Sequence, residues 1–124
     1  MRKFRDTRGK SWFDIVSEMD WQVDITESYP GTIRAFHHHL HKTEWMFVVL
    51  GEFKFVLTNP DEVVFLSQGD CLKIDPERWH GYQALSSEVT GIMMEVSTSK
   101  HDLANPDDQR KPWDAFDDWE KEKK

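Results

Sequence analysis

The feature that most constrains the fold of this chain is a series of short apolar runs between residues 22 and 98. The runs are rich in Val, Ile and Phe, and Gly, Pro, Asn and Asp separate them. Strands at intervals of about 8–12 residues with such punctuation are typical of a sandwich or a closed barrel. No long window shows a helical period. The pattern therefore predicts an all-β domain with strands near residues 45–50, 53–57, 63–66, 71–74 and 89–96.

The length of 124 residues predicts a single domain. We expect a barrel core over about residues 22–98 and a C-terminal extension over about residues 99–124. Trp12 to Val16 fits either a strand or a short helical turn. The extension contains three aromatic residues spaced three apart: Trp113, Phe116 and Trp119. On a helix this spacing would place all three on one face, and we expect these aromatic side chains to pack over the barrel.

Charge and composition exclude several classes of partner. The net charge is −7 and the 16 basic residues are scattered, so we expect no nucleic-acid partner. No apolar run approaches the roughly 20 residues that span a bilayer, and residues 1–10 lack the apolar core of a signal peptide. One cysteine, Cys71, excludes an internal disulfide and suits a reducing compartment. We expect a cytoplasmic protein, with Cys71 buried as a small apolar residue.

Histidines are concentrated in one short stretch, since four of the six lie between residues 37 and 41. On a strand, His37 and His39 would share one face. Glu44 opens the next apolar run, and His80 follows a later turn. Imidazole and carboxylate groups are the usual ligands of Zn, Mn, Fe or Ni. The pattern predicts a divalent-metal site with four ligands: His37, His39, Glu44 and His80. His38 and His41 are interpreted as surface residues outside this site.

The spacing of these residues resembles two motifs of the metal-binding cupins. The first is Gly31-x5-His37-x-His39-x4-Glu44-x6-Gly51. The second is the stretch from residue 69 to residue 80, with Glu77 where those proteins usually have a glycine. This resemblance implies a jelly-roll barrel, the double-stranded β-helix, and a homodimer.

A longer resemblance, over about residues 4–114, is to the dTDP-4-dehydrorhamnose 3,5-epimerase family and related nucleotide-sugar isomerases. Its supporting stretches are Asp6-x-Arg8-Gly9, residues 22–28, 31–37, 80–86 and 105–106, and Pro112-Trp113-Asp114. The resemblance implies a nucleotide-linked 4-keto-6-deoxy sugar as substrate and a role in surface-polysaccharide synthesis. It also implies residue roles: His37 as general base, Asp114 as the carboxylate that orients it, His80 as an active-site histidine, Arg34 on the phosphates, and Arg8 and Gln22 in substrate binding.

Three departures from that family change the expected chemistry. Glu44 stands where the family has a lysine, His39 where it has a glutamine, and Met93 or Met94 where it has a catalytic tyrosine. A metal could take over the charge role of the lysine as a Lewis acid on the ketone. The ligand pattern is similar to that of a zinc-containing epimerase domain in a bifunctional capsular-polysaccharide enzyme family.

A histidine whose lone pair is committed to a metal cannot act as a base. If His37 binds metal, the base must be Tyr82, Glu95 or a metal-bound hydroxide. An ionisable group such as Glu95 in an apolar strand is costly unless it is paired or functional.

Two other functions fit the same residues. A three-His, one-Glu site with an open position would also serve an iron oxygenase. A cupin that has lost the lysine and tyrosine could bind sugar or metal without catalysis. Four aromatic residues are interpreted as core or dimer-interface positions rather than sugar-stacking ones: Trp45, Phe47, Phe53 and Phe55.

Overall fold

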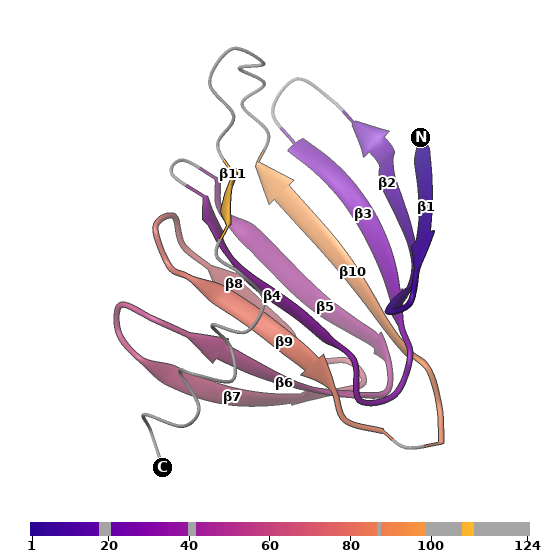
Figure 1. The fold of residues 1–124 in the computed structure, drawn as a ribbon. Coiled ribbons are helices and arrows are strands. Elements are labelled where there is room, and N and C mark those ends of the chain that lie inside the picture. Colours follow the sequence, from indigo (N-terminus) through magenta and orange to yellow (C-terminus); the bar gives the residue numbers. More distant parts are fainter. Residues whose placement is uncertain (18–20, 40–41, 87, 99–107, 111–124) are drawn as a thin grey trace.

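The structure is a computed structural model that describes residues 1–17, 21–39, 42–86, 88–98 and 108–110 (Figure 1). This described part of the chain contains strands and no helix, so the all-β prediction is confirmed. It accordingly has no helix long and apolar enough to cross a membrane.

The strands follow one another through short turns. Their bounds are β1 (Arg2–Asp6), β2 (Gly9–Ser17), β3 (Trp21–Ser28), β4 (Ile33–His39), β5 (Glu44–Leu50), β6 (Glu52–Leu57), β7 (Glu62–Ser67), β8 (Cys71–Ile74), β9 (His80–Ala84), β10 (Gly91–Thr98) and β11 (Asp108–Arg110). These bounds confirm the five expected strands to within two residues at every end. Trp12 to Val16 lies in β2, which settles the open choice in favour of a strand.

Two antiparallel sheets face each other in the molecule (Figure 1). The six-stranded sheet has the order β1-β2-β3-β10-β5-β8, and the five-stranded sheet has the order β11-β4-β9-β6-β7. The chain crosses from one sheet to the other after β3, β4, β5, β7, β8, β9 and β10. Alternate crossing of this kind closes the sheets into a jelly roll. The β1–β2 hairpin widens the six-stranded sheet beyond the core that the sequence predicted.

Aromatic and aliphatic side chains of β5 and β6 fill the space between the sheets. Phe53 and Phe55 are fully buried on β6, which confirms that they are core residues. Both contact Tyr82 of β9, with ring centroids 5.6 and 4.9 Å apart respectively. Met46 and Val48 of β5 face them from the other sheet. This packing fixes the strands that carry the site described below.

Two further expectations have different outcomes. Burial of Cys71 is wrong, because the residue is exposed. β8 is the edge strand of its sheet, and Cys71 pairs there with Phe47, on the side away from the core. The tail aromatics Trp113, Phe116 and Trp119 lie outside the described residues.

The turn before β9 contains a residue with unfavourable backbone geometry. Glu77 has a φ of +68°, a left-handed conformation that favours glycine. This is the position where the metal-binding cupins usually have glycine. The backbone therefore keeps the conformation of the motif although the residue type has changed.

Replacing Glu77 with glycine should stabilise the protein. A side chain at positive φ costs about 1–2 kcal/mol, and glycine costs up to about 1 kcal/mol in unfolded-state entropy. The net gain in the free energy of unfolding should be about 0.5–1 kcal/mol, measured by urea denaturation. Glu52→Gly, at an exposed strand position, is the matched control and should lower stability. A loss in both variants would contradict the assigned strain.

Candidate active site

The inner face of the six-stranded sheet is unusually polar. Asp24, Thr26 and Ser28 alternate along β3 and are each no more than 6% exposed. Ser97 of β10 is equally buried. Sequence reasoning did not single out these residues, although their alternation with Val23 and Ile25 is a period-two signal. Polar groups buried in this number are characteristic of a site rather than of a packing core.

Glu44 and His80 meet across the barrel from opposite sheets. Glu44 opens β5 and is 1% exposed, and His80 opens β9 and is 2% exposed. Their Oε1 and Nε2 atoms are 3.2 Å apart. The structure thus brings together two of the four expected metal ligands, which are separated by 36 positions in the sequence.

The backbone fixes the tautomer of His80. Nδ1 lies 2.9 Å from the carbonyl oxygen of Arg78, which can only accept, so Nδ1 carries a proton and donates it. Nε2 is thereby directed at the carboxylate of Glu44. Either a proton on Nε2 or a shared cation satisfies this arrangement, since a neutral ring would otherwise direct its lone pair at the negatively charged oxygen.

Glu95 adds a second carboxyl group to the Glu44–His80 pair. It lies on β10 opposite Met46 and Asp24, which places it on the inner face. Its side chain hydrogen-bonds Glu44, and its pKa is raised well above the usual value. Desolvation is the largest cause, followed by the negative charge of Glu44 and the hydrogen bond to it. Glu95 therefore belongs to the same cluster as the expected ligands.

The other two expected ligands lie on β4, whose strand positions 35–39 are described through their backbone. The register pairs residue 37 with His80 and residue 34 with Tyr82, with a shift between them. Paired positions of antiparallel strands share a face of the sheet. Among the residues whose side chains are described, no group of three forms a metal-binding cluster. The histidine side chains of β4 lie outside that set.

Tyr82 stands between the acidic cluster and two arginines. It is 6% exposed, and its hydroxyl group is 3.1 Å from Oγ1 of Thr26. Burial raises its pKa above 10.0, opposed by the positive charge of Arg34 and by the hydrogen bond with Thr26. The charge of Glu95 raises it further, so charged groups from both ends of the interior act on this hydroxyl.

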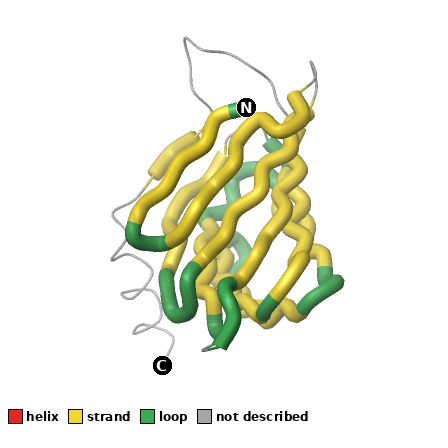
Figure 2. The backbone as a smooth tube through the Cα atoms, turned by 90° about the vertical axis from the view of Figure 1, so that its right-hand side faces the viewer, coloured by secondary structure: helices red, strands yellow, loops and turns green. Residues whose placement is uncertain are grey.

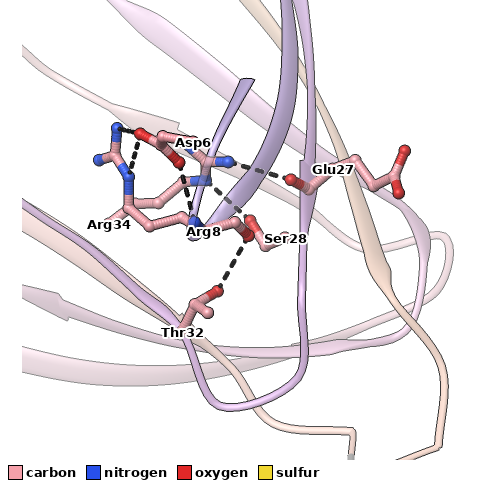
Figure 3. Close-up of polar contacts among 6 residues, drawn as sticks. All are labelled: Asp6, Arg8, Glu27, Ser28, Thr32 and Arg34. Carbon is pink, nitrogen blue, oxygen red and sulfur yellow. Dashed lines mark hydrogen bonds and ion pairs between the residues drawn. The ribbon is translucent and has the colours of Figure 1, made fainter. Parts of the chain in front are cut away.

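The arginines are held by specific partners (Figure 3). Arg34 donates from Nε to Ser28 at 2.8 Å and from Nη2 to the Glu27 carbonyl at 3.0 Å. Arg8 pairs with Asp6, and its hydrogen bonds lower the pKa of that carboxyl group. These contacts orient both guanidinium groups near the turn between β3 and β4.

Of the two remaining predicted site residues, Gln22 lies apart from these arginines. Gln22 donates from Nε2 to both carboxylate oxygens of Asp24, at 3.0 and 3.2 Å. It occupies the opposite end of β3 from Ser28, the partner of Arg34. Asp114 lies outside the described residues.

Alkaline titration should reveal the environment of Tyr82. Because its folded pKa is raised, its contribution to stability is present below about pH 10 and is lost as the pH rises through the folded value. The absorbance of tyrosinate should therefore show a step above pH 10 that disappears in Tyr82→Phe. Tyr29→Phe, the change at the second of the two tyrosines, should leave that step in place. A step that survives in Tyr82→Phe would contradict the assignment.

Comparison with known proteins identifies the family. A family model described as "Cupin domain" matches residues 25–97. This chain belongs to the cupin family. The match covers β4, β5 and β9, the strands that carry the expected ligands.

Two relatives of this cupin are similar in sequence over most of their length. "Probable low-salt glycan biosynthesis epimerase Agl13" of Haloferax volcanii is 27% identical, over 89% of this chain and 78% of the relative. "Spore coat polysaccharide biosynthesis protein SpsL" of Bacillus subtilis is 29% identical, over 75% of this chain and 68% of the relative.

A solved structure with the same fold is the capsular polysaccharide assembling protein CapF from Staphylococcus aureus, with a TM-score of 0.74 at 22% identity. The similarity covers 88% of this cupin but 31% of the CapF chain, and it shows the fold.

Proposed function

We propose that this cupin is a metal-assisted epimerase or isomerase of a nucleotide-linked 4-keto-6-deoxy sugar, acting in surface-polysaccharide synthesis. The observation that carries the proposal is the buried contact between Glu44 and His80. Two relatives named for glycan and spore-coat polysaccharide biosynthesis support the sugar substrate, and one of them is named an epimerase.

The donor set fits a divalent metal. Ligand atoms bound at about 2.0–2.2 Å lie about 3.0 Å apart at a right angle and about 3.4 Å apart at the tetrahedral angle. The observed 3.2 Å between Oε1 of Glu44 and Nε2 of His80 falls between these values. Residues that would hold the ion are these two together with His37 and His39 of β4. The Nδ1 contact to the backbone is the outer-shell support that metal-binding histidines usually have.

A bound metal would supply a Lewis acid for the sugar ketone. The remaining work falls to the side chains of the chain itself. The planar guanidinium group of Arg34, held by Ser28 and the Glu27 carbonyl, would bind the diphosphate. Tyr82 is protonated at neutral pH and would donate a proton to one face of the deprotonated sugar. Glu95, beside Glu44 on the inner face, would be the base, and its carboxyl group must be ionised before it can take the proton next to the ketone.

Metal content provides the first test of this proposal. Untagged protein, grown with added metal and analysed by mass spectrometry, should hold close to one ion per chain. Glu44→Gln and His39→Ala should each lose most of the ion, because each removes a ligand. Glu44→Gln does so without a large change in side-chain volume. His38→Ala is the matched control, one residue away in the same strand, and should retain the ion. Metal-free wild-type protein would contradict the metal-assisted mechanism.

Proton exchange provides the second test. A nucleotide-linked 4-keto-6-deoxy sugar incubated with the holoenzyme in deuterated water should gain deuterium beside the ketone, detected by NMR. Removing an acid–base group typically lowers the rate 10²–10⁴-fold, so Tyr82→Phe and Glu95→Gln should each cost at least about 10²-fold. Tyr29→Phe is the matched control and should exchange at the wild-type rate.

The alternative outcomes of this experiment are distinct. Tight binding of the sugar without deuterium uptake would identify a non-catalytic binding protein. Oxygen consumption by an iron-loaded protein would identify an oxygenase.

A further inference from the structure

The hydroxyl group of Thr26 reaches across the interior to the hydroxyl group of Tyr82. Thr26 lies on β3 of the six-stranded sheet and Tyr82 lies on β9 of the five-stranded sheet, so their 3.1 Å hydrogen bond joins the two layers of strands (Figure 2). Each residue is 6% exposed. A hydrogen bond that is shielded from water is electrostatically stronger than one at the surface, so this contact can fix the direction of both hydroxyl groups.

Thr26 borders an apolar row of the inner face. The register places it opposite Met93 of β10, which in turn lies opposite Val48 of β5, and both of these residues are buried. A hydroxyl group buried beside such a row costs free energy unless it is hydrogen-bonded. The contact with Tyr82 supplies that bond, so the hydroxyl group of Thr26 is accounted for by Tyr82 and not by packing.

The ring of Tyr82 is held by two aromatic residues of β6. Phe53 meets it edge to face, with an interplanar angle of 81°, and Phe55 is tilted by 32° against it. Such contacts set the position and the plane of the ring. They leave the hydroxyl hydrogen free to rotate about the bond between the ring and the oxygen. The direction of the O–H bond, which decides where the proton can go, therefore depends on a hydrogen-bond partner.

Tyr82 stands in the middle of the groups assigned to the substrate. It follows His80 by two positions on β9, so both side chains lie on the same face of the strand. Its paired position on β4 is Arg34, whose partner Ser28 lies two residues from Thr26 on β3. Successive inner positions of β3 thus hold neighbouring groups of the five-stranded sheet.

We propose that Thr26 is a positioning residue whose hydroxyl group donates to the oxygen of Tyr82 and thereby aims the tyrosine proton at the substrate. This inference rests on the proposed function. If Tyr82 donated to Thr26 instead, its proton would be committed to that bond and would not reach the sugar. A donor on the tyrosine oxygen leaves the proton free and stabilises the negative charge that forms there.

The proton that Tyr82 gives up leaves a negative charge beside Thr26. Ionised Glu95 takes the proton from the carbon next to the ketone, and Tyr82 then gives its own proton to the other face of that carbon. The O–H bond of Tyr82 breaks, a C–H bond forms, and the electron pair of the O–H bond stays on the tyrosine oxygen. Thr26 already contacts this oxygen and needs no reorganisation. Water then returns a proton to Tyr82 and accepts one from Glu95.

Deuterium exchange by the holoenzyme at saturating sugar tests this role. Thr26→Val should lower the exchange rate at least about tenfold, because a hydrogen bond to a charged group is lost. KM should stay within about twofold, since Thr26 acts through Tyr82 and not on the sugar. Thr26→Ser keeps the hydroxyl group and should restore most of the rate. Ser11→Ala is the matched control, since Ser11 is 1% exposed and pairs with Thr26 on β2, and it should exchange at the wild-type rate.

A double variant separates positioning from a general effect on the fold. In a Tyr82→Phe background, Thr26→Val should cost less than about twofold, because the group on which Thr26 acts is already absent. Equal costs of Thr26→Val in the wild-type and Tyr82→Phe backgrounds would overturn the proposal. So would a Thr26→Val enzyme that exchanges at the wild-type rate, or a Thr26→Ser enzyme as slow as Thr26→Val.

A measurement without sugar distinguishes failure of this inference from failure of the proposed function. Tyrosine is isotopically labelled at the ring carbon that bears the hydroxyl group, and the NMR signal of Tyr82 is identified by its loss in Tyr82→Phe. This signal should shift in Thr26→Val and return towards its wild-type position in Thr26→Ser. Absence of a shift would overturn the contact itself. A shift in a protein that shows no deuterium exchange would overturn the proposed function and, with it, the catalytic use of the contact.

Discussion

The buried contact between Glu44 and His80 is the interaction on which the polar residues around it depend. Burial of ionisable groups is costly unless hydrogen bonds or opposite charges compensate for lost hydration. Part of the compensation is identifiable: the backbone carbonyl of Arg78 accepts from His80, and the raised pKa of Glu95 favours its neutral form beside Glu44. The hydroxyl groups of Thr26 and Ser28 extend the polar lining towards Arg34. The space between the sheets is therefore lined by polar side chains on the six-stranded sheet and by the aromatic rings of β6 on the other.

A polar lining inside one sheet affects the outside of the same sheet. Side chains of a strand alternate between faces, so positions that place Asp24 and Thr26 inside place Val23 and Ile25 outside. The five-stranded sheet keeps the ordinary arrangement, with Phe53, Phe55 and Leu57 fully buried. Both sheets contribute to the site: the five-stranded sheet joins this hydrophobic core to His80 and Tyr82 of β9, and the six-stranded sheet supplies Glu44 and Glu95 from its polar inner face.

Much of the fold was predictable because its signals are local. Apolar runs and turn residues located the strands from β5 to β8, and motif spacing identified Glu44 and His80 as neighbours despite their separation in sequence. The β1–β2 hairpin was less predictable, since Trp12 to Val16 has no decisive period and depends on pairing with β3. Exposure of Cys71 depends on β8 being an edge strand, which is a property of topology. The contact between Glu95 and Glu44 likewise required the register of β10 against β5.

The position of β10 has a consequence for how the chain is made. This strand lies between β3 and β5, which are not hydrogen-bonded to each other, yet it is the last of its sheet to leave the ribosome. Until residues 91–98 emerge, the sheet exists as two halves, and the edges of β3 and β5 that later pair with β10 have no partner strand. Pairing of this kind is dominated by contacts distant in sequence and is intrinsically slow. The six-stranded sheet can therefore close only after residues 91–98 have been made, when β10 pairs with both halves.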